Sequence, residues 1–167
     1  VQRRTLGDRP VTWCEDIPAL PPGPLFLIAN EFFDALPVNQ YRREDGGFSR
    51  REVVLRNGRL VLAQGPVIVV PALSARMADT QIGDVVEHGS ARDAVAGAIG
   101  QRIAAEGGAA LVIDYGDWRS KGDTFQAVRA HGPVDPLADP GTADLTAHVD
   151  FEALSAAFGA GVEVSPM

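Results

Sequence analysis

The sequence predicts an α/β fold, and two observations support this prediction. Two short apolar runs, Leu25–Ile28 and Ala109–Ile113, each lead within three residues to an acidic residue, Glu31 and Asp114. An apolar pattern with helical spacing lies directly before the second run, between Ser90 and a Gly107-Gly108 stop. Continuous apolar strands separated by a helix are typical of parallel βα units. We therefore expect both runs to be buried strands of one sheet.

Extended segments joined by tight turns are predicted for the first part of the chain. Pro10–Cys14 can form a short strand, and a proline-rich connector separates it from the central buried strand Leu25–Asn30. Three further segments have strand composition: Val38–Arg43, Phe48–Arg56 and Arg59–Gln64. The last two flank Asn57-Gly58, which is a strong hairpin signal. Residues 38–70 are therefore expected to form an antiparallel hairpin insertion within the domain.

The second part of the chain is predicted to hold two helices and at least one more strand. Ser90 should begin the long helix, and Asp93 can close a capping box with it. Thr124–Arg129 has the composition of a strand. Apolar residues at helical spacing between 151 and 158 mark a short final helix, with Asp150 as its N-cap.

Composition limits the function classes. The 167 residues, 46% hydrophobic and 22% charged, are enough for one globular domain with a core. The net charge of −7 argues against a uniformly basic surface for nucleic acid. No apolar run approaches the roughly 20 residues of a membrane span. Cys14 is the only cysteine and the three histidines are scattered, so no disulfide framework or metal site is predicted.

Polar residues follow both apolar runs where the predicted strands end. Asn30, Glu31 and Asp34 come after the first run, and Asp114 and Tyr115 come after the second. In open α/β sheets ligands bind beyond the carboxyl ends of the strands. A simpler interpretation also stays open for each group: a helix-cap and turn cluster for the first, and an ordinary turn aspartate for the second.

A third candidate segment spans residues 140–150, where small, hydroxyl and acidic residues are frequent. Long ordered connections of this kind are often functional. Asp144, Thr146 and His148 alternate, so an extended backbone would place them on one face. His148 can equally be an ordinary surface histidine. The sequence contains no Gly-x-Ser-x-Gly elbow, which argues against a serine hydrolase. It contains no phosphate-binding P-loop either.

Three motifs carry a family resemblance: Ala-Asn-Glu-Phe-Phe-Asp-Ala-Leu-Pro at 29–37, Ile-Asp-Tyr-Gly at 113–116 and Gly-Thr-Ala-Asp-Leu-Thr-Ala-His-Val-Asp-Phe at 141–151. Together and in this order they resemble the MidA-like class I methyltransferases, which include the mitochondrial complex I assembly methyltransferase that modifies a protein arginine. The resemblance implies an S-adenosylmethionine-dependent enzyme with a partial Rossmann-like sheet. Residues 1–167 would be the central to C-terminal part of one domain, truncated at both ends. The family's Gly-rich cofactor loop would precede Val1, so the fragment alone is expected to be inactive.

The resemblance also implies roles for individual residues. Those expected near the cofactor are Asp16, Ile17 and Asn30. Carboxylates can hold the planar fork of a guanidinium and turn one nitrogen toward a methyl group. The candidates for this catalytic work are Glu31, Asp34 and Asp144. The residues expected to complete the substrate site are Asp114, Tyr115, Thr146 and His148.

The implied partner is a protein substrate with an exposed arginine, and the acidic composition suits such a cationic client. A homodimer is a further expected assembly. The expected location is the cytoplasm for a bacterial source and the mitochondrial matrix for a eukaryotic one. Two other classes of function stay open. One is a non-catalytic assembly module that binds a client through the same acidic loops, and the other is a hydrolase using Asp34, Asp114 and His148.

Overall fold

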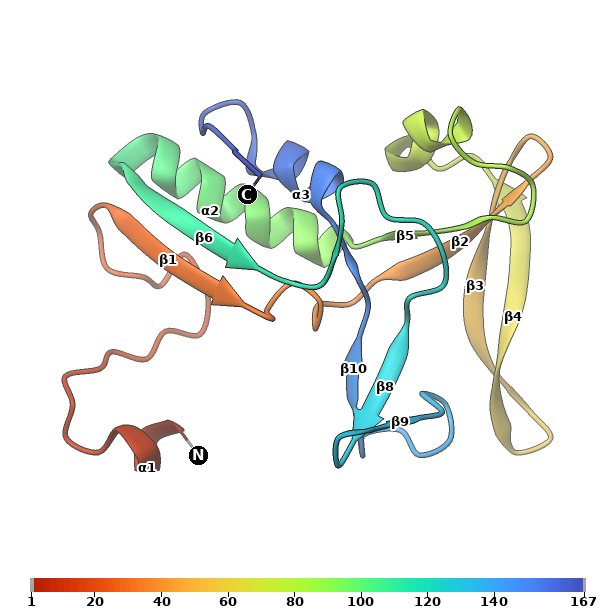
Figure 1. Ribbon diagram of the computed structural model, residues 1–167, viewed down its shortest axis with the longest axis horizontal. Coiled ribbons are helices and arrows are strands. Elements are labelled where there is room, and N and C mark those ends of the chain that lie inside the picture. Colours follow the sequence, from red (N-terminus) through yellow and green to blue (C-terminus); the bar gives the residue numbers. More distant parts are fainter. Residues whose placement is uncertain (1, 167) are drawn as a thin grey trace.

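The computed structural model describes residues 2–166, with helices and strands mixed along the chain (Figure 1). The helices are α1 (Gln2–Leu6), the 3-10 helix η1 (Pro71–Met77), α2 (Ser90–Glu106) and α3 (Phe151–Phe158). The strands are β1 (Leu25–Asn30), β2 (Asn39–Glu44), β3 (Gly47–Arg56), β4 (Arg59–Ile68), β5 (Val85–His88), β6 (Gly108–Ile113), β7 (Gly116–Asp117), β8 (Gln126–Arg129), β9 (Gly132–Val134), β10 (Asp144–Thr146) and β11 (Val149–Asp150). The predicted α/β class is confirmed. Within residues 2–166, no helix is long and apolar enough to cross a membrane.

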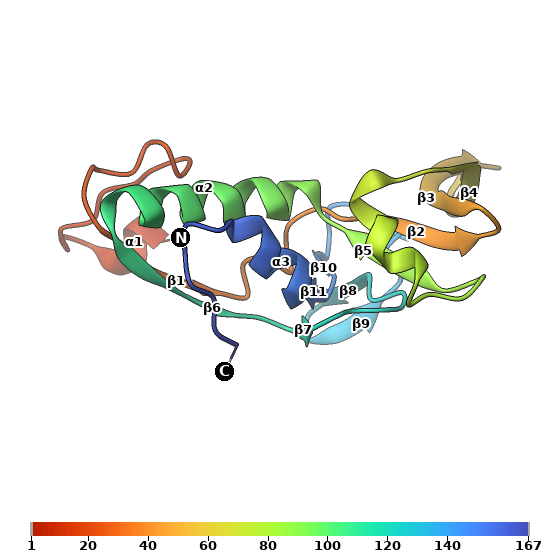
Figure 2. The same ribbon diagram turned by 90° about the horizontal axis from the view of Figure 1, so that it is seen from above.

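The two apolar runs form one parallel sheet, as predicted. β1 pairs with β6 from Leu25 opposite Gly108 to Asn30 opposite Ile113. Helices α2 and α3 cover one face of this pair (Figure 2). A core of buried side chains fills the space between the sheet and the helices: Ala29, Phe33, Ala96, Ile99, Val149 and Leu154.

The expectation that both apolar runs are buried strands is wrong for one face of the sheet. Phe26 and Ile28 point away from the helices and are 81% and 74% exposed, whereas Leu27 and Ala29 face the core. Side chains alternate between the two faces of a strand, so a helix layer on one side buries only every second residue. An unbroken apolar run indicates that both faces are apolar, but it does not identify what covers each of them.

The predicted hairpin group forms a separate antiparallel sheet with the order β4-β3-β2-β5 (Figure 1). Asn57 and Gly58 have φ angles of 50° and 75°, which matches the type I′ turn that this dipeptide favours. β4 continues to Ile68, four residues beyond the predicted end at Gln64. A second core lies against this sheet and contains Tyr41, Phe48, Leu73 and Val86.

Two local predictions are wrong and one is confirmed. α2 begins at Ser90 as predicted, but its N-cap is Gly89 and no side-chain cap bond forms, so the predicted capping box is absent. Pro10–Cys14 has no regular structure, in place of the predicted strand. Asp150 is the N-cap of α3, because its carboxylate accepts a hydrogen bond from the backbone N–H of Ala153. The predicted strand at 124–129 begins at Gln126.

Candidate functional site

The acidic residues that follow β1 and β6 leave the sheet at the same edge. Asn30 and Ile113 are the last paired residues of the two strands. The backbone N–H of Glu31 donates to the carbonyl oxygen of Ile113 at 2.8 Å, which extends the pairing by one step. Parallel strands therefore bring Glu31 and Asp114 together, as the sequence predicts.

Glu31 adopts a backbone conformation that is unusual for a residue with a side chain. Its φ of 47° lies in the left-handed region, which costs an ordinary residue roughly 1–2 kcal/mol. Its side chain is exposed and accepts a hydrogen bond at 3.2 Å from the hydroxyl of Tyr115. This bond raises the pKa of the Tyr115 phenol, because the nearby carboxylate favours the protonated form. Strained residues of this kind are concentrated at functional sites.

Asp114 fixes the loop that follows β1. Its Oδ2 accepts hydrogen bonds from the backbone N–H groups of Phe33, at 2.9 Å, and Asp34, at 3.2 Å. Its Oδ1 accepts from the backbone N–H of Tyr115 at 2.9 Å. Both carboxylate oxygens are therefore engaged by backbone donors, and they hold the loop from Glu31 onward against the end of β6.

Asp34 lies beneath the surface of this edge. Its side chain is only 5% exposed, and its buried Oδ1 has no hydrogen-bond partner in the described part of the chain. Burial raises the pKa of this carboxyl, and repulsion from Asp114 raises it further. The backbone carbonyl of Asp34 accepts a hydrogen bond from the N–H of Ala147 at 3.0 Å. This bond joins the loop after β1 to the segment after β10.

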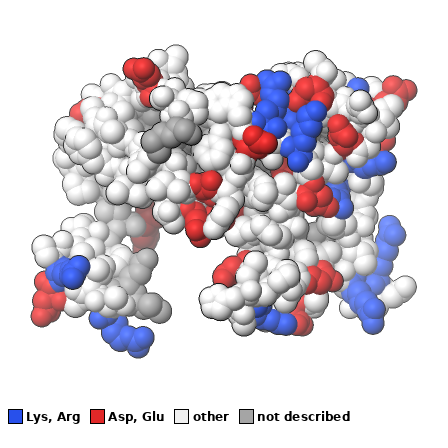
Figure 3. Space-filling view, in the orientation of Figure 1, with Lys and Arg blue, Asp and Glu red and all other residues white. Residues whose placement is uncertain are grey.

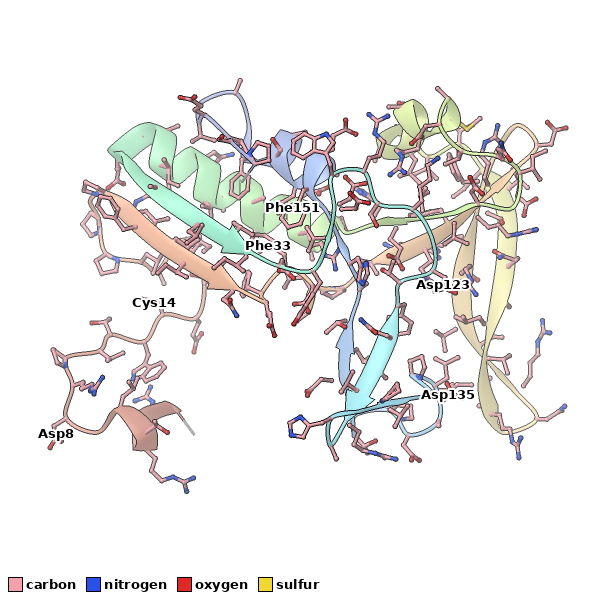
Figure 4. All side chains as sticks on the ribbon, viewed as in Figure 1. Asp8, Cys14, Phe33, Asp123, Asp135 and Phe151 are labelled. Atoms are coloured by element: carbon pink, nitrogen blue, oxygen red, sulfur yellow. The ribbon has the colours of Figure 1, made fainter. Side chains whose placement is uncertain are left out.

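Arg92, in the first turn of α2, ties these two loops together from below. Its guanidinium donates to the carbonyl oxygens of Ala147 at 2.6 Å, His148 at 2.7 Å and Asp34 at 3.2 Å. The side chain is buried, and burial lowers its pKa. Phe33 packs close by against the helices (Figure 4). Sequence reasoning did not identify Arg92, because an arginine early in a helix is usually a solvated surface residue.

The segment from Asp144 to His148 approaches this edge only at its end. Asp144 and Thr146 lie in β10, which pairs with β8 on a part of the fold that extends away from β1 and β6 (Figure 1). His148 is exposed, and its backbone N–H donates to the hydroxyl of Thr124 at 2.8 Å. That hydroxyl donates in turn to Glu87. No described hydrogen bond or ion pair joins Asp144 to Glu31 or Asp34.

The remaining predicted residues lie in the irregular segment before β1. Asp16 accepts a hydrogen bond from the backbone N–H of Ala19 at 2.9 Å, which closes a turn. Ile17 is partly buried and packs against the core under β1. Among residues 2–166 no group of three or more histidine, cysteine, aspartate or glutamate side chains is arranged to hold a metal ion.

The fold is that of an α/β protein, and acidic residues follow the carboxyl ends of the adjacent parallel strands β1 and β6. A sequence model of the family described as "Putative S-adenosyl-L-methionine-dependent methyltransferase" matches residues 1–166, and the chain belongs to this family. It is similar to the mitochondrial protein arginine methyltransferase NDUFAF7 of Xenopus laevis, with 40% identity over 154 residues, 88% of this chain and 34% of that one. The human protein of the same name is 39% identical over 154 residues, 87% of this chain and 33% of that one.

Solved structures show the same likeness. A Burkholderia thailandensis protein crystallised with S-adenosyl-homocysteine matches with a TM-score of 0.74 and 30% identity, over 94% of this chain and 44% of that one. A native structure from the same organism matches with a TM-score of 0.75, also at 30% identity, over 94% of this chain and 45% of that one. The chain thus spans about a third of the length of the curated relatives that it matches.

Proposed function

We propose that this chain is the central to C-terminal part of an S-adenosylmethionine-dependent domain that methylates an arginine of a protein client. The observation that carries the proposal is the meeting of Glu31, Tyr115 and Asp114 at the carboxyl ends of parallel strands, in a member of a methyltransferase family. The β1–β6 pair would belong to a Rossmann-like sheet, with residues 38–70 as an antiparallel insertion. A client of respiratory complex I assembly is the substrate that the family resemblance suggests.

The residues at this edge suit the chemistry of S-adenosylmethionine. The side chains of Asn30 and Glu31 are exposed and offer oxygen acceptors to hydroxyl and ammonium groups. Asp16 keeps one carboxylate oxygen free of its turn bond, and Ile17 adds apolar surface. When bound, the cofactor supplies a methyl group on a positively charged sulfur. We propose that Asn30, Asp16 and Ile17 hold it.

Glu31 is the residue that we propose to hold the acceptor guanidinium. Its carboxylate is exposed and fixed in direction by the strained backbone and by Tyr115. A carboxylate can accept two parallel N–H bonds from a guanidinium and so fix its plane. Alignment of this kind can contribute about 7–11 kcal/mol toward lowering a barrier. Asp34 and Asp114, whose carboxylates are buried or engaged by backbone, would position the loop that carries Glu31.

The segment that ends at His148 would contribute to binding the client. His148 is exposed beside the loop after β1, because Arg92 holds the carbonyls of both segments. Thr146 and Asp144 lie further along β10, where they can contact parts of a protein client away from the reacting arginine. For location, we propose the cytoplasm for a bacterial source and the mitochondrial matrix for a eukaryotic one, which agrees with the mitochondrial relatives.

The test compares Glu31→Gln with Glu163→Gln in the complete gene product that contains this chain. Both variants replace an exposed glutamate by its neutral isostere, and Glu163 serves as the control because it lies beyond α3, outside the candidate site. Loss of a charged hydrogen bond costs about 1.5–3 kcal/mol, or roughly one to two decades in rate. Transfer of tritiated methyl groups to an arginine-containing client should fall by that amount for Glu31→Gln only.

Equal methylation by the two variants would show that Glu31 does not hold the substrate. A complete protein that binds the client but transfers no methyl group would instead support the non-catalytic assembly module. Cofactor affinity, measured by calorimetry, should change much less than the methylation rate, because Glu31 is assigned to the acceptor.

A further inference from the structure

The long hairpin formed by β3 and β4, residues 47–68, is the most basic part of this acidic protein. We call it the β3–β4 arm. It contains four arginines and one glutamate, so it carries +3 in a chain whose net charge is −7. Figure 3 shows arginine side chains over the arm and at its far end. A basic projection on an acidic protein indicates a surface for an acidic partner.

The tip of the arm has two arginines with no acidic neighbour. Arg56 and Arg59 pair directly across the strands on either side of the Asn57-Gly58 turn. Like charges at directly opposed positions destabilise a hairpin. Neither side chain forms an ion pair within residues 2–166, whereas Arg50 and Arg51 are paired with Glu52 and Asp123. A carboxylate from another molecule would relieve the repulsion at the tip.

One face of the arm is apolar and exposed. Val53 pairs with Leu62 and Leu55 pairs with Leu60, and residues paired in this way share one face of the hairpin. Val53, Leu55 and Leu62 are 54%, 70% and 38% exposed. The tip arginines belong to the opposite face, because they are one position out of step with these pairs. The arm therefore presents exposed apolar side chains on one face, whereas on the other face the two arginines lie at the tip, next to the half-buried pair Val54 and Val61.

β4 is a free edge strand of unusual length. It ends the sheet order β4-β3-β2-β5, and its outer edge pairs with no other described strand. Its ten residues include a single charged one, Arg59. Natural edge strands are usually short, charged or covered, because their unpaired N–H and C=O groups bind other extended segments. Such edges accept a partner strand by β-augmentation.

A groove lies between the arm, the start of β2 and Phe125. It has a volume of about 580 Å³ and is lined by Val53 and Leu62 of the arm together with Gln40, Arg51 and Phe125. Phe125 follows Thr124, whose hydroxyl holds the backbone N–H of His148. Asp123, just before these residues, lies in the loop above β8 (Figure 4) and accepts hydrogen bonds from Arg51 and Gln40. The arm and the segment ending at His148 are thus joined by one chain of contacts.

We propose that the β3–β4 arm binds an extended segment of the protein substrate in which acidic and apolar side chains alternate, and that this segment adds to the free edge of β4. This proposal depends on the proposed function in one respect: it assumes that the bound segment belongs to the protein that is methylated. An added strand would direct its apolar side chains to the face of Leu60 and Leu62. Its acidic side chains would fall on the face of Arg56 and Arg59.

The first experiment measures binding without any cofactor or methyl transfer. The probe is a fluorescein-labelled decapeptide of alternating glutamate and valine, titrated with the 167-residue chain and followed by fluorescence polarisation. The same peptide with glutamine in place of glutamate tests the charge. Arg56→Glu/Arg59→Glu is compared with Arg4→Glu/Arg9→Glu, which makes the same change at two exposed arginines outside the arm. Val53→Thr/Leu62→Thr tests the apolar face while keeping strand propensity.

The acidic peptide should bind more tightly than the neutral one, and reversal of the tip charges should weaken binding roughly tenfold or more. The matched reversal at Arg4 and Arg9 should have little effect, and the threonine variant should also bind weakly. Circular dichroism on each variant verifies that it is folded. Equal weakening by both reversals, or a chain dimer in sedimentation that occupies the β4 edge, would overturn the proposal.

The second experiment assigns the partner. In the complete protein, the tip reversal should raise the KM for the protein client and leave kcat near its original value, because the arm does not contact the reacting arginine. Peptide binding with an unchanged KM would overturn the assignment to the substrate. The proposed methyl transfer is judged separately by Glu31→Gln, so either inference can fail while the other stands.

Discussion

Replacement of Arg92 by methionine should destabilise the fold strongly. Methionine keeps much of the aliphatic volume, but it removes the hydrogen bonds to the carbonyls of Asp34, Ala147 and His148. A hydrogen bond from a charged donor contributes about 1.5–3 kcal/mol. Removal of the guanidinium also relieves a desolvation penalty of several kcal/mol. The expected net loss is about 2–4 kcal/mol, which is a large share of a typical stability of about 5–15 kcal/mol.

Urea unfolding of the 167-residue chain, followed by far-ultraviolet circular dichroism, measures this loss. With a slope of about 1–3 kcal/mol per molar urea, the midpoint should fall by roughly 1–2 M. Arg9→Met is the matched control, because Arg9 is exposed and its side chain has no bond within residues 2–166. If the two variants unfold at the same midpoint, the loop carbonyls do not depend on Arg92.

Three further predictions concern the same edge. The pKa of Asp34 is raised in the folded state, so its contribution to stability is fully present below pH 3.8 and is lost as the pH rises through the folded pKa. Asp34→Asn should therefore raise Tm near neutral pH and leave Tm unchanged near pH 3. Equal Tm differences at the two pH values in scanning calorimetry would contradict this prediction. Glu31→Gly should raise Tm by relieving the left-handed strain, while methylation by the complete protein falls; an unchanged or lower Tm argues against stored strain. The 167-residue chain alone should bind S-adenosylmethionine weakly or not at all, and micromolar binding in a calorimetric titration would refute the expectation that residues outside this chain are needed to hold the cofactor.

The sequence predicted best those features of the fold that depend on a few neighbouring residues. The Asn57-Gly58 hairpin, the N-cap at Asp150 and the glycine stop after α2 each depend on the backbone preferences of one or two residues. The capping box at Ser90 failed because Gly89 took the N-cap position, one residue earlier. The exposed face at Phe26 and Ile28 could not be predicted, because burial depends on which other elements cover the sheet.

The candidate site was predictable only where strand pairing decides it. Glu31 and Asp114 meet because two parallel strands end together, and the apolar runs indicated both ends. Arg92 and Thr124 have no such signal, since each acts on backbone groups more than 20 positions away. The alternating pattern predicted that Asp144 and Thr146 lie on one face of an extended segment. It could not predict that this segment, β10, pairs with β8 and extends away from the site.

The contacts at the edge divide the residues into those that hold the loops and those that remain free. Asp114 and Arg92 bind backbone N–H and C=O groups of the two loops, and the Thr124 hydroxyl accepts a hydrogen bond from the backbone N–H of His148. Loops fixed through their backbone keep their position whatever side chains they carry, which leaves Glu31 and His148 free to contact other molecules. A site built in this way can exchange its exposed side chains without losing its fold, whereas loss of the Arg92 hydrogen bonds beneath it would destabilise the loops. Specificity for a client would therefore reside in the exposed side chains and in the β3–β4 arm. The buried polar residues would fix the positions of the loops that carry these side chains.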